Sequence, residues 1–147
     1  MIKKFIILFF LGTILLSCEK DKIPVELVDY SLIRDISFQN DLQPIFDKQC
    51  GTQGCHSYFE AAGKLDLQKY AYLDLTQEKS HEFPNMYRVK PNNLDSSVLI
   101  QKLNKNSAFG VGMPASLVGA NIVSIPLTGD SSLMMIKAWI MQGAKEN

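Results

Sequence analysis

The stretch Gln49–Ser57, "QCGTQGCHS", holds two of the three cysteines and one of the two histidines of this 147-residue chain. His56 directly follows Cys55, and four residues separate Cys55 from Cys50. Thiols and an imidazole at such short spacing are found in disulfide frameworks, in zinc sites and at covalent haem attachments. The role of these three side chains therefore decides what the surrounding domain has to enclose.

Two of these interpretations leave part of the pattern unexplained. A disulfide between Cys50 and Cys55 would close a six-residue ring worth roughly 2 kcal/mol, but it gives the adjacent histidine no role. A zinc site would use Cys50, Cys55, His56 and His81 as its four ligands. Side chains of neighbouring residues such as Cys55 and His56 diverge, so they rarely bind one tetrahedral ion together.

Covalent haem gives all three side chains a role. Both thiols would add to the vinyl groups of the porphyrin, and His56 would then be held as an axial ligand of the iron. The usual spacing has two residues between the cysteines, so two extra residues must bulge away. Gly51 and Gly54 are the residues best able to take the backbone angles that such a bulge needs.

The rest of the chain predicts a small all-α domain with long connections. Apolar spacing predicts short helices over 42–49, from about residue 66, over 96–104, and from about residue 130 to Gly143. The segments 80–93 and 104–126 are rich in Pro, Gly and polar residues and are predicted as loops. Loops of this length need a reason in a compact domain, and a buried cofactor that they wrap provides one.

Several segments, in this order, carry a family resemblance: "DLQPIFDKQC", "CH", "GKLDLQKYAYL", "KPNNLDSSVLIQKL", "MP" and "IKAWIMQGA". Over residues 37–147 the chain resembles the small cytochrome c domains of exported proteins from Planctomycetes and Bacteroidetes. The resemblance implies an all-α, cytochrome c-like fold whose short helices and long loops wrap one covalently bound haem.

The resemblance also assigns residues to roles. It implies that Cys50, Cys55 and His56 bind the haem and that Met113, before Pro114, supplies the sixth ligand. The last helix, around Trp139, would pack against the first. Two alternatives remain open, because methionines often fill gaps in a core and because His81 is a rival sixth ligand.

The N-terminus predicts export. Lys3 and Lys4 precede the apolar run 5–16, which would extend about 18 Å as a helix, whereas the hydrocarbon core of a bilayer is ~30 Å thick. The run ends at Ser17 and Cys18 and resembles a bacterial lipoprotein signal. We therefore expect residues 1–17 to be a signal peptide, Cys18 to be lipidated, 18–36 to be a tether and 37–147 to be the domain.

Charge and composition narrow the function. Loss of residues 1–17 removes two lysines and no acidic residue, so the formal charge changes from 0 to −2. Without a basic stripe, nucleic acid is not an expected partner. We expect a lipoprotein of the cell envelope, facing the periplasm or the surface, and the residues after Cys18 favour the outer membrane.

The expected function is electron transfer to a redox partner protein. With a histidine and a methionine on the iron, both axial positions are filled, and no acid, base or nucleophile constellation stands beside the motif. An open sixth position would instead admit an enzyme. The alternative from another class is a non-redox surface lipoprotein, a binding module with a Cys50–Cys55 disulfide.

Overall fold

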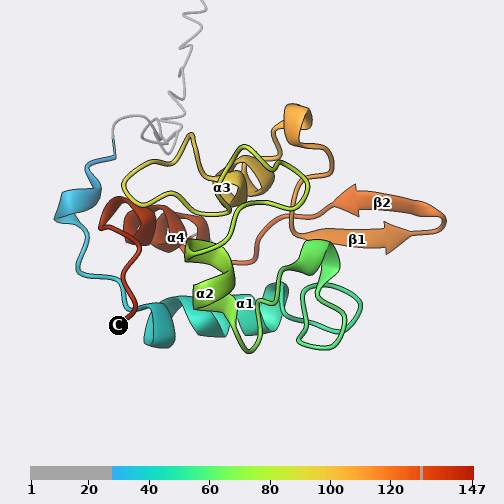
Figure 1. Ribbon diagram of the computed structural model, residues 1–147, viewed down its shortest axis with the longest axis horizontal. Coiled ribbons are helices and arrows are strands. Elements are labelled where there is room, and N and C mark those ends of the chain that lie inside the picture. The colour runs from blue at the N-terminus through green and yellow to red at the C-terminus, as the bar shows by residue number, and fades with distance from the viewer. Residues whose placement is uncertain (1–27, 130) are drawn as a thin grey trace, which may run out of the picture.

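The computed structural model describes residues 28–129 and 131–147. In these ranges the chain forms four short α-helices and one two-stranded antiparallel sheet (Figure 1). The elements are α1 (Gln43–Gln49), α2 (Ala71–Thr76), α3 (Val98–Leu103), β1 (Ala115–Val118), β2 (Asn121–Ser124) and α4 (Ser132–Met141). No helix in the described part has the length and apolar character needed to cross a bilayer.

The all-α, cytochrome c-like fold class predicted from the sequence is wrong, because the fold is mixed. Within the segment 104–126, which was predicted as loop, β1 and β2 pair antiparallel, with Leu117 opposite Ile122. Gly119 has φ +61° at the first position of a two-residue turn, where hairpins favour glycine. β-Branched residues in β2 and backbone pairing between the strands make this segment a hairpin.

The four predicted helices are present, although their boundaries differ. A π-helical turn, Phe38–Leu42, leads directly into α1. α2 begins at Ala71 and not near residue 66. The carboxylate of Asp66 accepts hydrogen bonds from the backbone N–H groups of Gln68 and Lys69, and these bonds form a turn before the helix. α3 and α4 lie where the apolar spacing predicts them.

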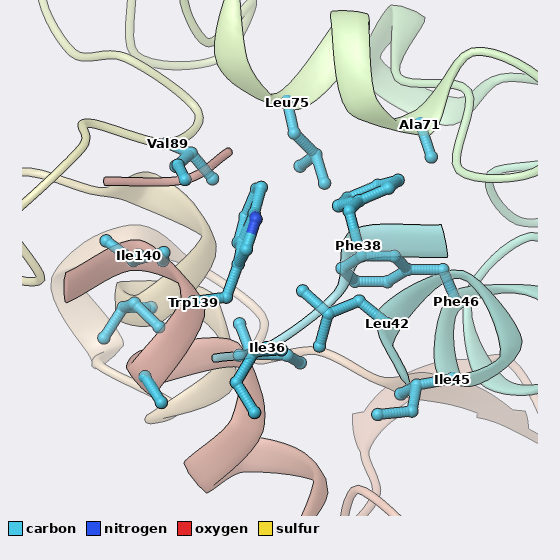
Figure 2. Packing of buried hydrophobic residues seen from close by; sticks show 14 of the residues in the cluster. Ile36, Phe38, Leu42, Ile45, Phe46, Ala71, Leu75, Val89, Trp139 and Ile140 are labelled. Carbon is cyan, nitrogen blue, oxygen red and sulfur yellow. The ribbon is translucent and has the colours of Figure 1, made fainter. Parts of the chain in front are cut away.

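The core joins α1 to α4. The Trp139 ring lies 5.2 Å from that of Phe38, whose centroid lies 6.0 Å from that of Phe46. Figure 2 shows Trp139 at the centre of this cluster, with Leu75 and Val89 nearby. The last helix, expected to pack against the first, packs against the π-helical turn Phe38–Leu42 that leads into α1.

Backbone hydrogen bonds end α4 just after Trp139 and fix the turn that follows it. The N–H of Gly143 donates to the Ile140 carbonyl, and that of Ala144 to the Trp139 carbonyl. This pairing, with Gly143 at φ +96°, is the Schellman motif that commonly ends a helix. The indole N–H of Trp139 then donates to the Lys145 carbonyl at 2.8 Å, which satisfies the one polar atom of the buried ring.

Part of the segment expected to be a tether is packed on the domain. Ile36 is buried, and its N–H donates to the side chain of Gln142. The Gln142 amide donates in turn to the carbonyls of Ile33 and Arg34. The expected signal peptide and Cys18 lie outside the described residues.

The buried aromatic side chains predict a clear stability contrast. Phe46 is 1% exposed and Phe59 is 89% exposed. Phe46→Ala should lower the free energy of unfolding by about 3–5 kcal/mol, because it removes a ring from the core and leaves a cavity. Phe59→Ala, the matched control, should change it by less than about 0.5 kcal/mol. Urea unfolding followed by circular dichroism measures both, and equal losses would contradict the described core.

Candidate functional site

The helix α1 ends where the cysteine loop begins. The backbone N–H groups of Cys50 and Gly51 both donate to the Phe46 carbonyl, at 2.8 and 2.7 Å. Because Phe46 is part of the core, the start of the loop is fixed by the packing of α1. The side chain of Gln49, the last residue of α1, exchanges two hydrogen bonds with the backbone of Thr128, which precedes α4.

The loop closes on itself and brings the three predicted side chains onto one short segment. The N–H of Cys55 donates to the Thr52 carbonyl, and that of His56 to the Cys50 carbonyl, both at 3.0 Å. Gly54 has φ +80°, as the expected bulge requires. A Cβ on Gly51 would lie 3.1 Å from the Leu67 carbonyl oxygen, so a side chain here would require the backbone of Leu67 to move by a few tenths of an ångström.

The imidazole of His56 is oriented. Its Nδ1 lies 3.1 Å from the Leu65 carbonyl oxygen, which only accepts hydrogen bonds, so Nδ1 carries the proton in the neutral ring. Nε2 then keeps its lone pair. A ligand histidine in a metal or haem site is held in this way, with one ring nitrogen bonded to the backbone and the other left for the metal.

The surroundings of His56 favour its neutral form. Burial lowers the pKa of His56, and hydrogen bonds with the backbone of Leu65 and Ala62 oppose this effect in part. The positive charges of Arg88 and Lys102 lower the pKa further. A neutral imidazole is the form that binds a metal ion.

Both thiols are free and half-buried. Burial raises the pKa of Cys50 to about 11, and the nearby Cys55 raises it as well. Cys50 is therefore a neutral thiol at physiological pH, unlike the thiolates of catalytic cysteines, which lie in electropositive surroundings.

Met113 lies at the base of the hairpin. Its backbone N–H donates to the Lys102 carbonyl at 2.9 Å, and Ile125 donates to the Pro114 carbonyl. The Met113 side chain is half-buried. Lys102 interacts with both candidate ligands. Its carbonyl accepts the hydrogen bond from the Met113 N–H, and its positive charge lowers the pKa of His56.

His81 has different surroundings. It is exposed and lines an open cavity of about 300 Å³. The other residues lining this cavity are all charged: Lys64, Asp74, Glu78, Lys79 and Arg88. Across the described ranges, no three His, Cys, Asp or Glu side chains gather as a metal ion would need, so the four ligands of the zinc interpretation are not brought together.

An apolar surface near the loop was not foreseen from the sequence. Leu117 on β1 is 72% exposed, and Val118 and Ile122 are each 60% exposed. In Figure 1 the hairpin and the loop that follows α1 lie at the same end of the molecule. Leu117 and Ile122 are paired across the two strands and lie on one face of the hairpin, whereas Val118, next to Leu117, lies on the other face.

Sequence reasoning also missed Arg88 and Lys102. Arg88 is buried, and its guanidinium donates to backbone carbonyls, which carry no signature in a sequence. Lys102 lies in α3, and its position in this short helix does not reveal from the sequence that its charge lies near His56.

No protein-family model, curated protein or solved structure matches the chain. The geometry itself defines a half-buried loop that holds two free thiols and one oriented, neutral imidazole.

The raised pKa of Cys50 predicts slow alkylation. In a chain carrying Cys18→Ser and Cys55→Ser, iodoacetamide should modify Cys50 at pH 7 more slowly when folded than when unfolded in urea, because burial, the largest cause of the raised pKa of Cys50, remains in this variant. The folded rate should increase about tenfold per pH unit up to that pKa. Equal folded and unfolded rates at pH 7 would show that the Cys50 thiol is not buried.

Proposed function

We propose that this protein is a membrane-anchored c-type cytochrome that carries electrons outside the cytoplasm through one haem attached to Cys50 and Cys55. The observation that carries the proposal is the His56 Nδ1 hydrogen bond to the Leu65 carbonyl, on the same closed loop as the two free thiols. It supports His56 as the axial ligand, because the bond leaves Nε2 available.

The residues of the loop fit this group. Covalent haem needs two reduced thiols within reach of solvent, and both thiols are free and half-buried. It also needs a neutral imidazole, which burial of His56 favours. When bound, haem would supply a one-electron couple at its iron.

The hairpin supports the same proposal. A small domain that holds a porphyrin needs apolar surface near the attachment loop, and Leu117, Val118 and Ile122 provide exposed apolar groups at that end of the molecule. The segment that carries Met113 joins this hairpin to α3, because the Gly112 carbonyl accepts a hydrogen bond from the Ser124 hydroxyl of β2 and the Met113 N–H donates to the Lys102 carbonyl of α3. Met113 is therefore our proposed second axial ligand, and His81, among charged side chains, is its rival.

The role is electron transfer and not enzymatic catalysis. Two filled axial positions leave no coordination site for a substrate, and the Cys50 thiol is not activated as a nucleophile. A redox partner protein follows from this role. The lipid anchor at Cys18 and the envelope location rest on the N-terminal sequence alone.

Covalent attachment is tested by following the haem through denaturing electrophoresis. After export with the cytochrome c maturation system, the parent protein should keep a haem stain in the gel. Replacing both Cys50 and Cys55 by Ser should abolish the stain, because no thioether forms. The control, His81→Ala, should leave it intact. Colourless parent protein with a Cys50–Cys55 disulfide would instead support a non-redox binding module.

The second axial ligand is tested by spectroscopy. Ferric parent protein should show the weak far-red band of sulfur-to-iron coordination. Met113→Ala should abolish the band, lower the reduction potential and open the iron to carbon monoxide, because a thioether ligand favours ferrous iron. The control is Met134→Ala, whose side chain is exposed on α4. A parent without the band, in which His81→Ala opens the iron, would show two histidine ligands.

A further inference from the structure

Residues 63–67, here named the His56 strap, run beside the imidazole. The Leu65 carbonyl of the strap accepts a hydrogen bond from His56 Nδ1–H, and the Leu67 N–H donates to the His56 carbonyl at 2.8 Å. Just before the strap, the Ala62 N–H donates to the Cys55 carbonyl at 3.0 Å. The orientation of the imidazole therefore depends on where the strap lies.

A buried arginine holds the strap. Arg88 Nη2 donates to the Lys64 carbonyl at 2.7 Å and to the Gly63 carbonyl at 3.4 Å. Its Nη1 donates to the Asp74 carbonyl at 2.9 Å. The guanidinium thus joins the start of the strap to α2, and its acceptor Lys64 is the direct neighbour of Leu65.

Asp74 holds the middle of the strap from the same helix. Its carboxylate accepts the Asp66 N–H at 2.7 Å and lies 3.8 Å from Arg88 Nη1. The Leu65 carbonyl therefore lies between two bonded points, at residues 64 and 66. Two contacts to Asp74 of α2, one through Arg88 and one direct, flank the carbonyl that accepts from His56 Nδ1.

The strap needs this support because its backbone is strained. Gly63 has φ +64° and Lys64 has φ +55°. Left-handed backbone is unfavourable for a residue with a Cβ such as Lys64, and residues of this kind persist only where their surroundings hold them. The Arg88 bond to the Lys64 carbonyl is such a constraint.

We propose that Arg88, with Asp74, is a positioning residue for His56, holding the Leu65 carbonyl against Nδ1 so that Nε2 is free to bind. That Nε2 binds a ligand rests on the proposed function. The contacts of Arg88 and Asp74 with the strap are independent of it. The planar guanidinium reaches three carbonyls at once, and a lysine ammonium does not reproduce that fork.

The tautomer of His56 tests the inference without haem. In the haem-free chain with reduced thiols, nitrogen chemical shifts of ¹⁵N-labelled histidine give the share of rings protonated at Nδ1. In the parent, nearly all neutral His56 rings should carry the proton there. In Arg88→Met and Arg88→Lys the share should fall about twofold, because no single bond then selects the tautomer.

The control is Arg34→Met, since Arg34 is an exposed arginine paired with Asp41. It should leave the tautomer unchanged. An unchanged tautomer in both Arg88 variants would overturn the proposal. A tautomer restored by Arg88→Lys but lost in Arg88→Met would also overturn it, because charge alone would then suffice.

Asp74→Ala keeps the test decisive if circular dichroism shows that the Arg88 variants do not fold. It removes the acceptor of the Asp66 N–H and the partner of Arg88, while alanine suits helix α2. The Nδ1 share should fall again, and an unchanged share would overturn the proposal. Failure of haem attachment would overturn the proposed function only, because the tautomer is measured without haem.

Discussion

His56 is hydrogen bonded at three points, and the candidate site depends on these bonds. Its N–H closes the loop onto Cys50, its carbonyl accepts from Leu67, and its ring donates to Leu65. Backbone bonds on both sides fix the main chain, and the bond from Nδ1 to the Leu65 carbonyl fixes the ring. The two thiols and the imidazole are thereby arranged before any ligand binds, which lowers the entropy lost on binding.

The hydrophobic core sets the position of this loop. Phe46 packs in the core near Phe38, and its carbonyl accepts the N–H groups of both Cys50 and Gly51. Trp139 closes the same core from α4, whose C-terminal turn is fixed by Gly143. A change in the α1 and α4 packing would therefore move Cys50 directly.

Local signals in the sequence predicted the helices and the side chains of the loop, but not the hairpin or the strap. Apolar spacing located α3 and α4, and the cysteine spacing located the loop. The apolar pairs around Gly119 were a strand signal that the surrounding Gly and Pro residues obscured. No pattern predicted Arg88, because its acceptors at residues 63, 64 and 74 are backbone carbonyls brought together only by the fold.

Positive charge near His56 has two consequences that point the same way. Burial is the largest cause of the lowered pKa of His56, and the charges of Arg88 and Lys102, which are paired with Asp74 and Glu82, lower it further by a smaller amount. The same charges oppose an added positive charge at a metal bound to Nε2, because the repulsion is stronger in a partly buried site than in water. For the proposed carrier, this favours ferrous over ferric iron. The thioether of Met113 would act in the same direction, so both the charges and the second ligand favour a raised reduction potential.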